Sequence, residues 1–428
     1  MSEEKQKETL LQEGEEYFKK LGPGLVTGAA DDDPSGIATY SQAGAQFGTG
    51  LLWLSVWTLP FMITIQEMCA RIALVTGNGL AANIKHSYRK ELLQVITILL
   101  LIANTFNIGA NLGVMAKVIQ LLRPGLSFTF LVIFIGVICL LLPVIIPYKK
   151  YARYLKWLVI TLFSYIITGF IIKMDWSILL RDSFIPHITF SKDYILLITA
   201  VLGTTISPYL FFWETSQEVE EEIAEGRMTV SSRRGTNPVE IKKMRTDVWT
   251  GMFLSNIVMF FIIAVCANTL FTNGITNINT ASDAALALLP LAGSFAMLLF
   301  AIGIIGTGLL AVPVLASSTS YAISESFGWK EGLYRKFKKA RAFYMIIIFS
   351  ILVGILTNFI GLHPIKALIY SAIVNGIIAP VIIIFIVHIS SSHKIMGHYK
   401  NSIIKKIIGW LAVVLMSIIA IAAIVSLF

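Results

Sequence analysis

The sequence predicts an all-α membrane protein in which two inverted five-helix repeats are followed by one more helix, giving eleven transmembrane helices. Three observations support this fold class. The 428 residues are 56% hydrophobic and only 14% charged, whereas a soluble domain has about 25% charged residues. Apolar stretches of about 20 residues, enough to cross a bilayer, recur along the whole chain. Two of these stretches are interrupted near their middle by polar residues and helix breakers, at 31–36 and 204–208.

The expected transmembrane helices are defined by the apolar stretches in order. They cover residues 24–47, 51–75, 92–122, 126–147, 154–173, 194–216, 247–271, 286–323, 340–359, 364–389 and 403–428.

Basic residues predict how these helices are oriented. They gather in the N-terminal segment and in alternate loops, including 227–245 and 330–341, while the opposite loops hold only Arg123, Lys173, Arg181, Lys192 and Lys366. Since cytoplasmic loops carry the excess of Lys and Arg, we expect the N-terminus in the cytoplasm and the C-terminus outside. The same clusters account for the net charge of +9, so we expect no nucleic-acid partner. Residues 1–20 lack an apolar core, which predicts a cytoplasmic tail rather than a cleaved signal peptide.

The interrupted stretches divide the chain. Residues 21–174 form the first expected repeat, 175–193 an extracellular loop, 194–389 the second repeat and 390–428 the eleventh helix. Five helices per repeat place the two repeats in opposite orientations, which is the architecture of LeuT-type transporters, whose substrates bind at discontinuous helices. The hydrophilic segment 217–246 lies between the sixth and seventh expected helices, inside the cell, and we expect its glutamates to form a solvated face.

The first break has the chemistry of a cation site. A half-helix that ends inside the membrane exposes carbonyl oxygens and a partial negative charge. Asp31, Asp32 and Asp33 lie there, followed by Pro34, and an intramembrane carboxylate is a functional-site hypothesis by default. Successive helical residues point about 100° apart, so the three cannot share one face. We assign the ion to Asp33, and Gly36 leaves room for a hydrated ion.

The second break supplies neutral oxygen atoms. Thr204 and Ser207 carry hydroxyls, and Thr205 adds a backbone carbonyl. Together with Asp33 these are hard donors that suit Mg²⁺, Ca²⁺ or Mn²⁺, and no Cys, His or Met stands at either break to favour a softer metal. The predicted metal ligands are therefore Asp33, Gly36, Thr204 and Ser207. The alternative is that both hydroxyls bond back to carbonyls of their own helix.

At these positions the sequence resembles the Nramp family of divalent-metal transporters. The motifs that carry the resemblance are Gly22-Pro23-Gly24, Asp33-Pro34-Ser35-Gly36, Gln42-Ala43-Gly44-Ala45, Val75-Thr76-Gly77 with Leu80-Ala81, and Pro208. At the second of these the family has Asp-Pro-Gly-Asn. The family's eleven helices and internal N-terminus agree with the expectation above.

Departures from the family pattern indicate a particular branch. The family's Met-Pro-His in the sixth helix is Ser207-Pro208-Tyr209 here, and the acids of its Asp-Leu-Ala-Glu stretch correspond to Asn107 and Ala110. A methionine sulfur favours soft transition metals, and neither Asn nor Ala can release a proton. The pattern resembles the Nramp-related magnesium transporters, which implies transport of Mg²⁺, and Mn²⁺ as well, without proton coupling.

Three alternatives stay open at this point: a proton-coupled Mn²⁺/Fe²⁺ importer, a Na⁺-coupled organic-solute symporter of the same fold, and a metal sensor that binds ions without transporting them. An enzyme is not expected, because no nucleophile and base are paired at a usable spacing. We expect no cofactor beyond the transported ion, and a monomer in the cell membrane whose partners are the ion and the lipid bilayer.

Overall fold

The computed structural model describes residues 22–146, 163–172, 174–279, 281–288, 296–361 and 363–427. Its longer helices are α2 (Pro23–Asp31), α3 (Pro34–Phe47), α5 (Leu59–Thr76), α7 (Lys90–Leu122), α8 (Phe128–Ile145), α10 (Phe163–Ile171), α11 (Trp176–Phe184), α12 (Lys192–Thr205), α13 (Pro208–Ala224), α15 (Pro238–Thr269), α18 (Ala296–Phe327), α19 (Arg341–Thr357), α20 (Pro364–Ser391) and α22 (Ile403–Leu427). Short helices are α4 (Trp53–Trp57), α6 (Leu80–Ser87), α14 (Val230–Arg233), α16 (Ala281–Ala285) and α21 (His393–Met396).

The fold is all-α, as predicted. Eight helices of the described residues are long and apolar enough to cross a membrane, and the apolar helix α19 is slightly shorter. Each of the eleven expected stretches contains helix, although the first part of 154–173 lies outside the described residues, as does the expected tail 1–20. The number of membrane crossings therefore stays a prediction.

Both interruptions are present where the sequence predicted them. The first separates α2 from α3 at Asp32 and Asp33, and the second separates α12 from α13 at Ile206 and Ser207. Proline occupies the first position of α3 and of α13, where its fixed φ suits a helix start and its missing N–H costs nothing.

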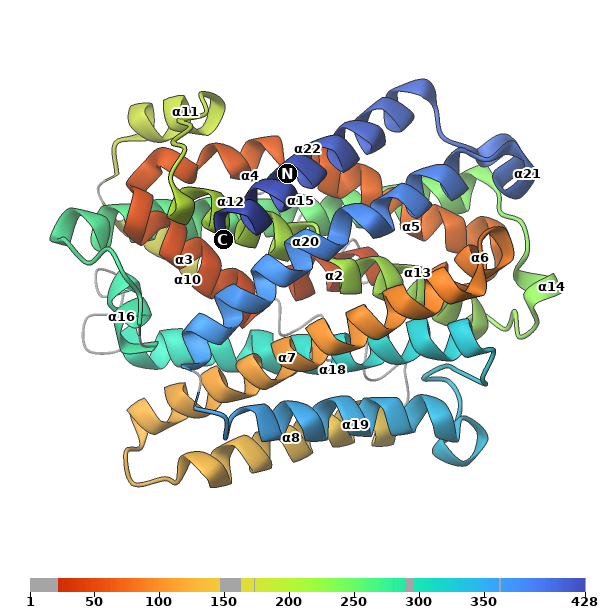
Figure 1. Ribbon diagram of the computed structural model, residues 1–428, viewed down its shortest axis with the longest axis horizontal. Helices are drawn as coiled ribbons and strands as arrows, with labels where there is room; N and C mark the ends of the chain where they lie inside the picture. The colour runs from red at the N-terminus through yellow and green to blue at the C-terminus, as the bar shows by residue number, and fades with distance from the viewer. Residues whose placement is uncertain are drawn as a thin grey trace, which may run out of the picture.

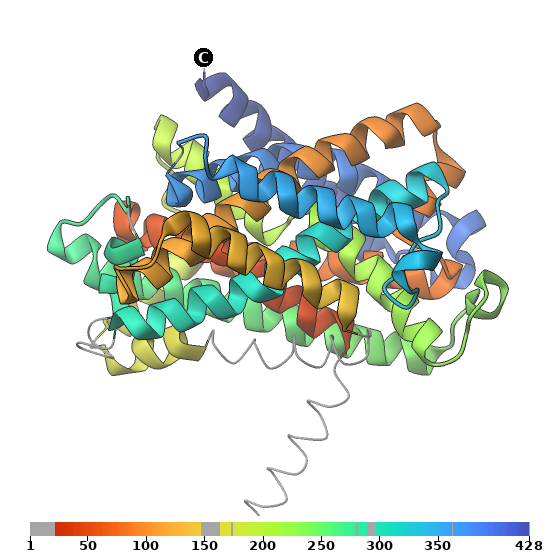
Figure 2. The ribbon, with the colours of Figure 1, turned by 90° about the horizontal axis from the view of Figure 1, so that it is seen from below.

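The broken helices lie in the interior of the bundle. Helix α15 packs against α2 and α3, α12 packs against α20, and α7 packs against α18 and α20. Helices α8 and α19 lie side by side at one edge of the molecule (Figure 1). The far end of α22 projects from the bundle (Figure 2). Thus the breaks are enclosed by other helices.

Glycines allow α15 to approach α2 closely. A Cβ added to Gly251 would lie 2.1 Å from the carbonyl oxygen of Gly24, and one added to Gly28 would lie 2.2 Å from that of Gly251. Small residues at such crossings let helix backbones pack tightly inside a membrane. Backbone contact at these glycines fixes the position of α2 along the axis of α15.

The expected solvated face of the segment 217–246 is wrong. Residues 217–246 continue α13 to Ala224 and already begin α15 at Pro238, and Glu218, Glu220 and Glu222 are buried rather than solvated. Glu220 explains why: it accepts hydrogen bonds from the hydroxyl of Tyr321 and from the backbone N–H groups of Leu333 and Tyr334. Glu220 thus holds the loop at Leu333 and Tyr334 in place.

Candidate ion-binding site

The two breaks face each other because each half-helix contacts a half-helix of the other pair. Helix α13 packs against α2, and α12 packs against α3. The hydroxyl of Tyr209, in the first turn of α13, donates a 2.7 Å hydrogen bond to the carbonyl oxygen of Ala30 in the last turn of α2. The hydroxyl of Thr204 lies 3.4 Å from that of Tyr40 on α3. The sequence-predicted residues of both breaks are thus brought into one region.

Asp33 caps helix α3. Its Oδ1 accepts a 2.8 Å hydrogen bond from the backbone N–H of Gly36, and its Oδ2 accepts a 3.2 Å bond from the side-chain amide of Asn111 on α7. The side chain is buried, with 2% of its surface exposed. A carboxylate has about four acceptor positions, so these two bonds orient Asp33 and leave capacity for a cation.

Gly36 lies in the first turn of α3, which Asp33 caps. A Cβ at this position would lie 2.9 Å from the carbonyl oxygen of Asp31. Glycine therefore allows the first turn of α3 to approach the end of α2, and its N–H holds the Asp33 carboxylate.

Ser207 presents an unused oxygen. It is the N-cap residue of α13, but its side chain makes no capping hydrogen bond. The hydroxyl is fully buried and has no hydrogen-bond partner in the described part of the chain. A buried polar group without a partner costs about 1–3 kcal/mol, which a bound ion or its water would offset.

The alternative expectation was that the hydroxyls bond back to carbonyls of their own helix. It applies to Thr204 but not to Ser207. The hydroxyl of Thr204 donates to the carbonyl of Val201 at 2.8 Å, as does that of Thr205 at 2.9 Å. Both hydroxyls are thus bonded back to their own helix, and only the oxygen lone pairs are left to face an ion.

The other two aspartates differ from Asp33. Asp31 accepts a 2.6 Å hydrogen bond from the hydroxyl of Ser255 on α15. Asp32 is fully buried, and neither of its carboxylate oxygens has a hydrogen-bond partner among the described residues. Asp32 is therefore the carboxylate at the break with the most unused acceptor capacity among the described residues.

Side-chain amides on α7 lie beside Asp33. Asn111 also lies 3.3 Å from Asn107, whose side-chain oxygen accepts a 3.1 Å bond from Ser371 on α20. One turn earlier on α7, Asn104 donates to Thr319 on α18 at 2.8 Å. Hydrogen bonds through Asn111 and Asn107 therefore connect Asp33 to α20 through groups that do not titrate.

A row of contacts along α2 was not predicted from the sequence. Asp247 accepts hydrogen bonds from the backbone N–H groups of Gly24 and Leu25, Gly251 touches the α2 backbone, and Ser255 binds Asp31. The spacing of four places all three on one face of α15. That spacing of small and polar residues within an apolar stretch was the available sequence signal.

The donors at the breaks are mostly oxygen atoms. Among the described residues, no three His, Cys, Asp or Glu side chains form a metal-binding group. An ion at the breaks would therefore be held by one or two carboxylates together with hydroxyl, carbonyl and water oxygens. Such a set suits a hard ion that keeps part of its hydration shell.

Comparison with known proteins places this geometry in a family. The family model described as natural resistance-associated macrophage protein-like, or Nramp, matches residues 24–426. A divalent metal cation transporter MntH of Caldanaerobacter subterraneus is 25% identical over 402 residues, which cover 92% of this chain and 89% of that protein.

Solved structures show the same fold. A manganese transporter of Eremococcus coleocola superimposes with a TM-score of 0.75 at 17% identity, covering 96% of this chain and 87% of that one. The inward-facing conformation of Mhp1 gives a TM-score of 0.55 at 14% identity, covering 95% and 89%. The fold is thus the LeuT-like fold predicted from the two breaks. This chain belongs to the Nramp family of divalent-metal transporters and is a multi-pass membrane protein.

Proposed function

We propose that the protein imports Mg²⁺, and Mn²⁺ as well, by alternating access and without moving protons. The observation that carries the proposal is the donor set at the breaks: the Asp33 carboxylate faces an amide chain on α7, and Ser207 contributes a buried hydroxyl that has no partner among the described residues. Hard oxygen donors do not discriminate against Mg²⁺ as a sulfur ligand would.

Asp33 supplies negative charge, Thr204 and Ser207 supply oxygen atoms or contacts to bound water, and Gly36 leaves space for the hydration shell. Mg²⁺ gives up its water reluctantly and usually keeps several water molecules in proteins. A site with few charged ligands therefore suits it. Asp32 is a further candidate ligand, because its buried carboxylate lacks a partner among the described residues.

Lack of proton coupling is supported by the residues around Asp33. Asn107 and Asn111, which hydrogen-bond to each other beside Asp33, have side chains that cannot release a proton, and Tyr209 uses its hydroxyl to hold Ala30. An interior-negative potential contributes about 2.3 kcal/mol per charge per 100 mV. A divalent ion gains twice this amount, so uptake needs no proton gradient.

A proton-coupled Mn²⁺ importer is the second candidate. The relatives named above are a divalent metal cation transporter and a manganese transporter. The observation that favours it is the buried acid Glu214, which accepts a hydrogen bond from Thr27 and whose other oxygen has no partner in the described ranges. Acidification of the vesicle lumen during Mn²⁺ uptake would favour this candidate.

We further propose the orientation and division of the chain expected from the sequence. Residues 21–174 and 194–389 are the two repeats, 175–193 is extracellular, and 390–428 ends outside the cell. The positive loops 227–245 and 330–341 would lie in the cytoplasm. Labelling of single cysteines introduced at Lys338 and at Trp176 with a membrane-impermeant reagent tests this, because only the second should react on intact cells.

The experiment that tests the function is ion uptake into proteoliposomes under an imposed membrane potential. Mg²⁺ and Mn²⁺ should both enter, and a lumenal pH dye should stay constant. Rejection of Mg²⁺ would remove the proposed selectivity.

A further inference from the structure

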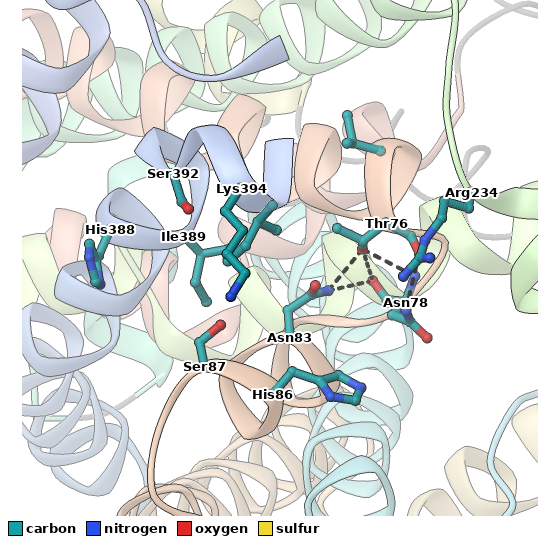
Figure 3. Close-up of a pocket in the computed structure, with 12 residues that line it drawn as sticks. Thr76, Asn78, Asn83, His86, Ser87, Arg234, His388, Ile389, Ser392 and Lys394 are labelled. Atoms are coloured by element: carbon teal, nitrogen blue, oxygen red, sulfur yellow. Dashed lines mark hydrogen bonds between the residues drawn. The ribbon is translucent and has the colours of Figure 1, made fainter. Parts of the chain in front are cut away.

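A second site lies at the end of the molecule that carries α6 and α21, away from the two breaks. A cavity of about 730 Å³ opens there between the ends of α5 and α20, and its lining includes His86, Arg234, His388 and Lys394. Figure 3 shows His388 and Lys394 on one side of the cavity and Arg234 on the other. No carboxylate is among the residues that line it in the described part of the chain.

The cations of this cavity differ from others on the same face. Arg227 pairs with Glu222, Glu225 and Glu240. By contrast, neither Arg234 nor Lys394 forms an ion pair with any described residue. Both are exposed in the lining, so an anion can reach them.

The floor of the cavity is a rigid polar surface. The side-chain amide of Asn83 donates to the hydroxyl of Thr76 at 2.9 Å and to the carbonyl of Gly79 at 2.8 Å. The side-chain amide of Asn78 donates to the carbonyl of Thr76 at 3.1 Å. These bonds fix the corner between α5 and α6, so the cationic walls surround a preformed space.

His388 adds an oriented donor. The hydroxyl of Tyr88 hydrogen-bonds to Nδ1 of His388. When Tyr88 donates in this bond, the proton of the imidazole is on Nε2, which is then available to donate to an anion.

We propose that this cavity binds a phosphate-bearing anion, with Arg234 and Lys394 as its charged ligands. Arginine pairs with phosphate oxygens through two parallel N–H bonds, and lysine contributes a point charge. A cavity of this size can accommodate a ligand as large as a nucleotide or a lipid headgroup. Basic pockets between the ends of transmembrane helices are known recognition sites for anionic headgroups. The ligand is therefore either the headgroup of an anionic phospholipid or a soluble phosphate compound.

The site would connect the two repeats. Thr76 and His86 belong to the first expected repeat, whereas Arg234 and His388 belong to the second. An anion that contacts both would favour conformations in which these parts lie close together, so its occupancy would influence transport. Binding itself does not depend on which metal is carried.

Two probes distinguish the sources of the anion. The first is inorganic pyrophosphate added to the purified full-length protein in Mg²⁺-free buffer. The second is phosphatidylglycerol in lipid nanodiscs, compared with nanodiscs of phosphatidylcholine alone. A ligand that binds the folded protein raises its thermal midpoint in a saturable way, and the shift should weaken as the salt concentration rises.

The matched variants carry the same change of charge on the same face. Arg234→Gln with Lys394→Gln should weaken binding of the active probe about tenfold or more, since each loses a charged hydrogen bond. Lys338→Gln with Lys339→Gln, outside the cavity lining, should change it by less than about twofold. A shift with only one probe identifies the source. A shift with neither, or equal losses in both double variants, would overturn the proposal.

Discussion

Asp33 has two roles that a pair of substitutions can separate, because it caps α3 and is also the proposed ion ligand. In Asp33→Asn the side-chain oxygen can still accept the N–H of Gly36, and Asn caps helices about as well as Asp. Asn111 can turn its amide so that the oxygen, which has no partner among the described residues, accepts from the new side chain. We therefore expect Asp33→Asn to fold with a thermal midpoint close to that of the wild type.

Asp33→Asn should nevertheless bind Mg²⁺ much more weakly than the wild type. Removing one member of a buried charge pair costs about 2 kcal/mol or more, which corresponds to about 30-fold in affinity. Asp33→Ala removes the cap as well and should lose about a further 1 kcal/mol of stability. The assay is a Mg²⁺ titration by isothermal calorimetry, with thermal unfolding of the same samples.

The matched control is Asp31→Asn, since Asp31 is bonded to Ser255 rather than placed as a ligand. It should reduce Mg²⁺ affinity less than Asp33→Asn does. Wild-type affinity in a well-folded Asp33→Asn sample would refute the assignment and transfer it to Asp32.

Three further predictions follow from single contacts. Ser207→Met should favour Mn²⁺ and Cd²⁺ over Mg²⁺ in competition uptake, because a thioether prefers soft metals; an unchanged selectivity order would place Ser207 outside the site. Tyr209→Phe leaves the carbonyl of Ala30 without its 2.7 Å donor, so stability should fall by about 1–3 kcal/mol and Mg²⁺ transport with it. Tyr344→Phe, which removes another 2.7 Å bond to a carbonyl, should lower stability alone. Gly251→Ala should destabilise the protein by about 1–3 kcal/mol through overpacking. Gly303→Ala, where a Cβ meets no atom within 4 Å, should leave the unfolding temperature unchanged or raise it, because alanine favours a helix more than glycine does.

The sequence predicted the broken helices because the physical conflict is local. Three acids and a proline inside an apolar stretch cannot continue a lipid-facing helix, so the break had to line a polar region. Contacts of this local kind, such as the 3.6 Å ion pair between Glu67 and Arg71 one helical turn apart, follow from helical spacing alone.

Contacts between distant segments could not be predicted in the same way. The bond from Tyr209 to Ala30 joins residues 179 positions apart, and the burial of Glu220 depends on a loop more than a hundred residues later. Neither is set by local helical periodicity. The roles of Asp31 and Asp32 were also unresolved, because which acid finds a donor depends on α7 and α15 rather than on the break itself.

Simultaneous recording of Mg²⁺ flux and lumenal pH in proteoliposomes would show whether Asp33 carries Mg²⁺ without protons. With an interior-negative potential and no pH gradient, we expect Mg²⁺ uptake with a constant pH signal, and loss of uptake in Asp33→Asn. Proton entry that rises and falls with metal flux, or undiminished Mg²⁺ uptake by the variant, would contradict this expectation.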